Sequence, residues 1–219
     1  MTAVLFDMDG VLVDSEDYWV EREREDIFPE VVADGPIPPA EIAGMNYREM
    51  FDYLDEHYDV TVDRETFLEL FDRTAREIYT EHAALLPGVK TLLDDLHAEG
   101  HLAAIVSSSP PDWIDLVVDR FDLDDFDAVI SAETVERGKP APDVYEYAAE
   151  TLGVDPADCI AVEDSENGVE AAVRAGVTVI GYRTGADEDV DLSAADVVVE
   201  TPDALRDEIR NRTALHRRS

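Results

Sequence analysis

The stretch AVLFDMDG, residues 3–10, joins a short apolar run to two carboxylates that lie two positions apart. Four apolar residues that end at turn-forming residues predict a buried β-strand followed by a turn. Residues i and i+2 of a strand point the same way, so Asp7 and Asp9 are expected to face one spot beyond the carboxyl end of the strand. Because α/β proteins bind ligands at this edge of the sheet, the stretch predicts a strand with a candidate site at its end.

Short apolar runs recur along the chain and alternate with helical patterns. Further strands are expected at residues 102–106, 128–130, 159–162, 177–180 and 197–199. Between them, the segment from residue 89 has apolar residues at i, i+3, i+4 and i+7, and Gly100 ends this helical pattern. The alternation indicates an α/β fold in which helices cover both faces of a doubly wound, mainly parallel sheet.

Residues 15–82 break this alternation, because they show helical patterns and no convincing strand. Ser15 is suited to begin a first helix, and two more helices are expected around residues 50–58 and 63–78. These helices predict a small all-helical domain inserted after the first strand. We therefore expect an α/β core domain of residues 1–14 and 88–219 and a helical domain of residues 15–87.

The chain carries an extreme negative charge. Its 219 residues include 53 Asp and Glu but only 17 Lys and Arg, which gives a formal net charge of -36. Lys90 and Lys139 are the only lysines. Such a composition is typical of halophilic proteins, which work at salt concentrations that screen distant charges. It makes nucleic acids and anionic membranes poor partners, because both are bound through Lys and Arg.

Two further features bear on where the protein works. Cys159 is the only cysteine, so no intrachain disulfide is possible. The sequence has no basic leader with an apolar run behind it, and no stretch approaches the roughly 18 apolar residues of a membrane span. We expect a soluble cytoplasmic protein.

Polar side chains also follow two other predicted strands. Ser107 comes directly after the strand at 102–106, and Glu163 and Asp164 follow the strand at 159–162. Lys139 lies between them along the chain, in a Gly-Lys-Pro sequence. Several strands are therefore expected to end in groups of the kind found at functional sites.

Four motifs, taken in chain order, resemble the signature motifs of the haloacid dehalogenase-like (HAD) superfamily: Asp7-x-Asp9, Ser107, Lys139 and Glu163-Asp164. The stretches FDMDGVLVDSE, GKPAPDVY and VEDSENGVEAA are similar to the branch of HAD phosphatases with a helical cap. That branch includes phosphoglycolate phosphatases, sugar-phosphate phosphatases and β-phosphoglucomutase. The resemblance runs from about the first residue to about residue 184, and it implies that the inserted helical domain is the cap.

The resemblance implies catalytic roles for Asp7, Asp9 and Lys139. Asp7 is expected to attack phosphorus and form an aspartyl-phosphate, while Asp9 acts as general acid and then as general base. Lys139 is expected to bridge Asp7 and the phosphoryl oxygens, and Ser107, Ser108 and Lys139 to bind the phosphate. Taken alone, Asp7 and Asp9 would fit a plain turn equally well, and only the four motifs together favour catalysis.

The resemblance also implies Mg²⁺ as the cofactor. The expected ligands are the carboxylates of Asp7 and Asp164 and the backbone carbonyl of Asp9, with Glu163 bound either directly or through water. One loop of the cap resembles the loop that many relatives lower over the leaving group of the substrate. The candidate specificity residues of this loop are Gly44, Asn46 and Arg48.

The expected function is Mg²⁺-dependent hydrolysis of small phosphate monoesters, such as phosphoglycolate or sugar phosphates, by a monomer or weak homodimer. Asp9 argues against a dehalogenase, and the lack of lysine in residues 15–87 argues against a phosphonatase. β-Phosphoglucomutase carries a histidine where this chain has Trp19, which makes a phosphosugar mutase the second candidate. A non-catalytic protein that binds phosphate esters is the third.

Overall fold

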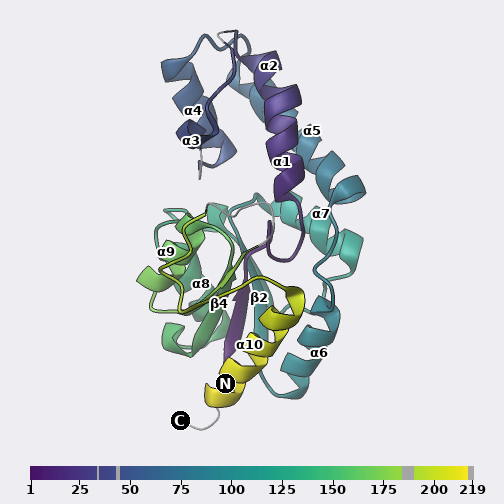
Figure 1. The fold of residues 1–219 in the computed structure, drawn as a ribbon, viewed down its shortest axis with the longest axis vertical. Coiled ribbons are helices and arrows are strands. Elements are labelled where there is room, and N and C mark those ends of the chain that lie inside the picture. Colours follow the sequence, from purple (N-terminus) through teal and green to yellow (C-terminus); the bar gives the residue numbers. More distant parts are fainter. Residues whose placement is uncertain (34, 43–44, 184–189, 217–219) are drawn as a thin grey trace. The chain divides into compact units, whose positions relative to one another are not determined.

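The computed structural model describes residues 1–33, 35–42, 45–183 and 190–216. The chain divides into two compact units (Figure 1). The first consists of Met1–Asp14 and Ala84–Ser219, and the second of Ser15–Ala83. The first unit is built on a β-sheet and the second on helices, so each is described by itself below.

The first unit contains a six-stranded sheet in the order β3-β2-β1-β4-β5-β6, and all neighbouring strands run parallel. The predicted α/β fold with a mainly parallel sheet is therefore confirmed. The strands are β1 (Ala3–Phe6), β2 (Leu102–Ser107), β3 (Ala128–Ser131), β4 (Cys159–Glu163), β5 (Thr178–Tyr182) and β6 (Val197–Val199).

Helices cover both faces of the sheet, because the central strands carry apolar side chains on both sides. On one face, α8 (Asp143–Leu152) and α9 (Glu166–Arg174) bury a core with alternate residues of β1, β2, β4 and β5. Figure 1 shows α6 (Val89–Ala98) and α10 (Pro202–His216) on the other side of the sheet from α8 and α9. Helix α7 (Pro111–Phe121) packs against β3.

Strand β1 lies between β2 and β4, and its four apolar residues are fully buried. The chain continues from β1 towards one edge of the sheet through β2 and β3, and later towards the other edge through β4, β5 and β6. Such a reversal leaves a crevice beyond the carboxyl ends of the central strands, where ligands of α/β proteins bind. The fold therefore places the residues that follow β1, β2 and β4 at this crevice.

Residues 84–87 belong to the sheet unit, although they were expected in the helical domain. The backbone N–H of Asp14 donates to the carbonyl of Ala84, and the N–H of Leu86 donates to the carbonyl of Leu12. An isolated bridge also pairs Val13 with Leu85. Backbone hydrogen bonds thus tie this segment to residues 12–14, and the compact helical unit ends at Ala83.

The second unit is helical, with one isolated bridge between Val32 and Val60. Phe67 and Leu54 are fully buried in its core, and the Phe67 and Phe71 rings lie 4.8 Å apart. Its helices are α1 (Glu16–Arg22), the π-helix η1 (Glu23–Ile27), α2 (Phe28–Val31), α3 (Pro39–Ile42), α4 (Tyr47–His57), α5 (Arg64–Glu77) and the π-helix η2 (Ile78–His82). That this unit acts as a cap stays a prediction.

Among the described residues, no helix has both the length and the apolar character that crossing a membrane requires.

Candidate active site

Asp7 directly follows β1 and is only 8% exposed. Its backbone N–H donates to the carbonyl of Val162 at 3.0 Å, which continues the pairing of β1 with β4 by one residue. This hydrogen bond fixes the backbone of Asp7 at the mouth of the crevice. The side chain therefore starts from a rigid strand end, as a reacting group requires.

Lys139 reaches this carboxylate from the loop before α8. Its Nζ donates to Oδ1 of Asp7 at 2.6 Å, to Oε1 of Glu163 at 2.6 Å and to the carbonyl of Val106 at 3.1 Å. An ammonium has three donors, and these acceptors use all of them. With its side chain only 4% exposed, Lys139 is a fixed positive charge beside Asp7.

Burial and charge act against each other in this ion pair. Burial raises the pKa of Asp7 to about 7, more than the charge of Lys139 lowers it, and the charges of Glu163 and Asp9 add to the rise. Burial lowers the pKa of Lys139, but the charges of Asp7 and Glu163 together raise it by more. The pKa therefore lies above its ordinary value. The ammonium therefore keeps its proton throughout the neutral range.

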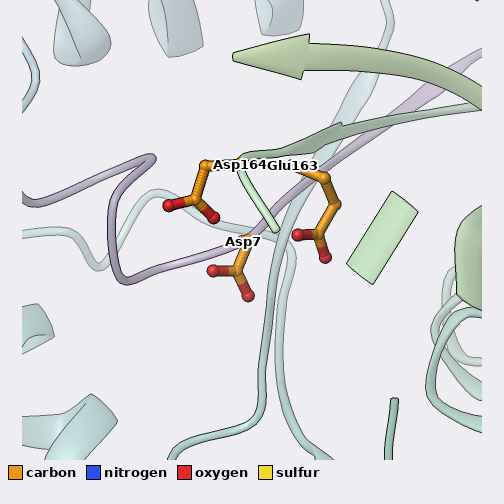
Figure 2. Close-up of side chains that lie close together, drawn as sticks. All are labelled: Asp7, Glu163 and Asp164. Carbon is orange, nitrogen blue, oxygen red and sulfur yellow. The ribbon is translucent and has the colours of Figure 1, made fainter. Parts of the chain in front are cut away.

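Asp164 completes a group of three carboxylates. Asp7, Glu163 and Asp164 each offer an oxygen, and these atoms lie within 4.8 Å of one another. Figure 2 shows the three side chains, with Glu163 and Asp164 leaving the end of β4 in different directions. Successive residues of a strand alternate in direction, so this separation follows from their adjacent positions.

Glu163 is fully buried and is surrounded by hydrogen-bond donors. Besides Lys139, the hydroxyl of Tyr145 donates to its Oε1, and the hydroxyl of Ser165 donates to its Oε2 at 3.3 Å. Burial and the neighbouring carboxylates hold the pKa of Tyr145 well above its ordinary value, so the hydroxyl keeps its proton. Both oxygens of Glu163 are thus bound by protein groups.

The serines that follow β2 have different surroundings. Oγ of Ser107 accepts the backbone N–H of Ser109 at 3.0 Å, which leaves the hydroxyl proton of Ser107 for another acceptor. The hydroxyl of Ser109 donates to Oδ2 of Asp9 at 2.9 Å, and the hydroxyl of Ser131 donates to the carbonyl of Ser109 at 2.7 Å. Ser108 is exposed. Ser109 is therefore the residue that ties this loop to Asp9.

Of the three candidate specificity residues of the helical unit, the structure describes Asn46 and Arg48. Gly44 lies outside the described residues. Oδ1 of Asn46 accepts the backbone N–H groups of Arg48 and Glu49, and Glu49 accepts the N–H of Asn46, which is a capping box at the start of α4. The Arg48 guanidinium lies 4.9 Å from the centre of the Tyr47 ring. A part for these residues in substrate selection stays a prediction.

The structure thus brings Asp7, Asp9, Lys139, Glu163 and Asp164 together at one edge of the sheet. Sequence reasoning missed three residues that hold this group in place. They are Ser109, which binds Asp9, Tyr145, which binds Glu163, and Gly168, which packs against Glu163. The sequence does contain a signal for Gly168, because glycine inside a helical pattern is unfavourable and usually indicates a close contact with a neighbouring group.

The parallel sheet and the carboxylates at its edge agree with the class that comparison with known families gives, a hydrolase. The chain matches the family model described as haloacid dehalogenase-like hydrolase over residues 4–182. It belongs to that family.

Relatives within the family include phosphatases and a mutase. Hexitol phosphatase B of Escherichia coli (strain K12) is 36% identical over 183 residues, which cover 78% of each chain. Beta-phosphoglucomutase of Bacillus subtilis (strain 168) is 30% identical over 201 residues, which cover 84% of each chain. CbbY from Rhodobacter sphaeroides, solved in complex with phosphate, has the same fold, with a TM-score of 0.78 at 23% identity over 94% of this chain and 96% of that chain.

Proposed function

We propose that this chain is a Mg²⁺-dependent phosphatase that hydrolyses small phosphate monoesters, such as phosphoglycolate or sugar phosphates, through an aspartyl-phosphate on Asp7. The observation that carries the proposal is the buried ion pair of Asp7 and Lys139 at the carboxyl edge of the sheet, with 2.6 Å between Oδ1 and Nζ. A carboxylate attacks phosphorus when the phosphoryl charge is neutralised, and Lys139 supplies a fixed charge for that purpose. The 36% identity to a hexitol phosphatase supports the same reaction class.

The oxygen atoms at this edge fit Mg²⁺. Asp7 and Asp164 offer carboxylate oxygens close to each other, and Mg²⁺ is commonly held by one or two carboxylates while keeping several waters. Asp7 and Asp164 would hold the ion, together with the backbone carbonyl of Asp9. Once bound, it would neutralise charge on the phosphate group.

Three side chains would carry the chemistry. Asp7 attacks phosphorus as the carboxylate, and the neighbouring charge of Lys139 favours this form and stabilises the equatorial oxygens of the transition state. Asp9 protonates the leaving alkoxide and then takes a proton from the water that hydrolyses the aspartyl-phosphate. The hydrogen bond from Ser109 holds one oxygen of Asp9 in place during both steps.

The test is phosphate release from a panel of small monoesters, including phosphoglycolate and hexose phosphates, with Mg²⁺ in molar KCl. We expect turnover of at least one ester by the wild type and none by Asp7→Asn. Circular dichroism establishes that both proteins are folded under the assay conditions. Undiminished turnover by a folded Asp7→Asn variant would refute the proposed mechanism, and binding of esters without turnover by the wild type would favour a non-catalytic binding protein.

A phosphosugar mutase is the second candidate, and the similarity to beta-phosphoglucomutase of Bacillus subtilis favours it. Trp19, which stands where that class carries a histidine, stacks on Phe71 with 5.9 Å between ring centres and donates from Nε1 to the hydroxyl of Tyr79 at 3.2 Å. These contacts give Trp19 a packing role in the helical unit. Interconversion of glucose 1-phosphate and glucose 6-phosphate with a bisphosphate primer would establish the mutase, and its absence at every primer concentration would dismiss it.

A further inference from the structure

Glu163 shares its motif with Asp164, yet its carboxylate has different surroundings. It is 0% exposed, and Oε1 accepts hydrogen bonds from both Lys139 and Tyr145. The hydroxyl of Ser165 donates to Oε2. A metal ligand needs a lone pair directed at the ion. Both lone pairs of Oε1 are taken by Lys139 and Tyr145, and Oε2 is directed at Ser165 and Gly168.

Gly168 makes room for this carboxylate. A Cβ atom at position 168 would lie 1.9 Å from Oε2 and 2.1 Å from Cδ of Glu163. Gly168 is the third residue of α9, where its N–H is accepted by Ser165, the residue that caps the helix. Glycine in a helix costs about 0.5–1 kcal/mol relative to alanine. Gly168 therefore makes α9 less stable than alanine would, but it leaves the space that the Glu163 carboxylate occupies.

Tyr145, on α8, contacts both the Glu163 carboxylate and the Lys139 ammonium. Its hydroxyl donates to Glu163, and its ring centre lies 5.4 Å from Nζ of Lys139. The ring is fully buried, so it cannot turn towards solvent. One side chain thus limits the positions of both the carboxylate and the ammonium.

We propose that Tyr145 is a positioning residue that, with the space left by Gly168, holds the Glu163 carboxylate on Lys139, so that Glu163 orients the lysine and does not bind the metal ion. The lysine, held by Glu163 and by the carbonyl of Val106, keeps its third hydrogen bond on Asp7. The inference rests on the proposed function for the roles of Asp7 and Lys139.

Metal binding tests the inference without any turnover. Mn²⁺, which stands in for Mg²⁺, is titrated into the full chain in molar KCl and followed by electron paramagnetic resonance. We expect Asp164→Asn to weaken Mn²⁺ binding by about tenfold or more, and Glu163→Gln and Tyr145→Phe to change it by less than about twofold. A loss in Glu163→Gln equal to that in Asp164→Asn would make Glu163 a metal ligand and overturn the inference.

Kinetics test the positioning role. Tyr145→Phe keeps the ring and removes the hydroxyl, so we expect kcat to fall by about tenfold at an unchanged KM, because the hydrogen bond to a charged group is lost. The control is Tyr147→Phe, which removes a hydroxyl from a 41% exposed tyrosine of the same helix and should leave kcat unchanged. Equal kcat values for Tyr145→Phe and the wild type would contradict the proposal.

A double substitution shows whether Tyr145 acts through Glu163. If it does, Tyr145→Phe lowers kcat in the wild type but has no further effect in a Glu163→Ala background. Additive losses would mean that Tyr145 acts independently of Glu163 and would overturn the inference. If the wild type shows no turnover of any ester, the proposed function fails, and the Mn²⁺ titration alone then decides the place of Glu163.

Discussion

At the scale of single residues, Lys139 is one of only two lysines in the chain, so replacing it tests the site and the other lysine serves as a control. The side chain of Lys139 is 4% exposed and pairs with two carboxylates, so Lys139→Met would leave Asp7 and Glu163 buried and facing each other. Removing one partner of a buried pair costs about 3–5 kcal/mol. We expect a loss of this size in the free energy of unfolding, measured with urea in molar KCl, together with loss of turnover.

Lys90 provides the matched control, because it is the other lysine of the chain. Its side chain is 51% exposed, and its Nζ lies 3.7 Å from a carboxylate oxygen of Asp122. Lys90→Met should change the free energy of unfolding by less than about 0.5 kcal/mol and leave turnover intact. Equal effects of the two substitutions would contradict the account of Lys139.

Ser109 offers a second test at this scale. Its hydroxyl donates to Asp9, so Ser109→Ala would release the proposed acid and base while leaving the backbone of the loop in place. We expect kcat to fall by about tenfold, the effect of losing one hydrogen bond to a carboxylate. Ser109→Thr retains the hydroxyl and should keep most of the activity. Wild-type kcat in Ser109→Ala would rule out this role.

The sequence predicted which residue types gather at the site, but not how they are held. Asp7, Asp9 and Lys139 were found because short motifs follow predicted strands. The hydrogen bond between Ser109 and Asp9 joins residues 100 positions apart in the sequence. The hydrogen bond between Tyr145 and Glu163 joins a helix to a strand. No local pattern encodes such pairs, because they arise only when the sheet aligns its strand ends.

At the scale of elements, buried strands were the most predictable part of the fold. Apolar runs such as residues 159–162 match observed strands closely, since a parallel sheet covered on both faces needs continuous apolar sequence. The two π-helices were not predicted, because a single widened turn hardly changes the spacing of apolar residues. The boundary after Ala83 was also missed, because it depends on backbone hydrogen bonds of residues 84–86.

The π-helix η1 carries a half-buried carboxyl group that makes a prediction about pH. Burial raises the pKa of Glu23 from 4.5 to about 7. The folded state then binds more protons than the unfolded state between these values, so stability falls as pH rises from 4.5 to 7 and stays lower above 7.

Glu23→Gln removes this titration. We expect the variant to have a higher Tm than the wild type at pH 8, and the difference to shrink as the pH falls towards 5, measured by circular dichroism in molar KCl. Glu25→Gln neutralises an exposed carboxylate of the same helix and controls for the change in net charge. A variant that is no more stable than the wild type at pH 8 would show that burial of Glu23 carries no such penalty.

At the scale of the whole molecule, the net charge of -36 makes a prediction about salt. Like charges repel across the folded surface, and the Debye length falls to about 3 Å at 1 M salt. We expect Tm to rise by about 10 °C or more between 0.1 M and 2 M KCl, which corresponds to about 3 kcal/mol for a chain of this size. A Tm that does not change with KCl would argue against adaptation to high salt.

The same charge is compatible with an anionic substrate, because the site holds a buried lysine and a group of carboxylates that could bind a cation. Lys139 is buried beside Asp7, and Mg²⁺ bound by Asp7 and Asp164 would add two positive charges. At molar salt, the distant carboxylates are screened, whereas contacts inside the site are screened much less. Direct contacts with Lys139 and with a bound Mg²⁺, rather than the net charge of the chain, would then decide phosphate binding.

Detection of a phosphoryl group on Asp7 would test the proposed aspartyl-phosphate mechanism without relying on a rate. The folded wild type is mixed with its best ester and Mg²⁺ in molar KCl, quenched in acid within one turnover, digested and analysed by mass spectrometry. We expect a phosphoryl group on Asp7 of the N-terminal peptide, and neither modification nor turnover in Asp7→Asn. Turnover without any phosphoryl group on Asp7, or turnover that survives in Asp7→Asn, would contradict this mechanism.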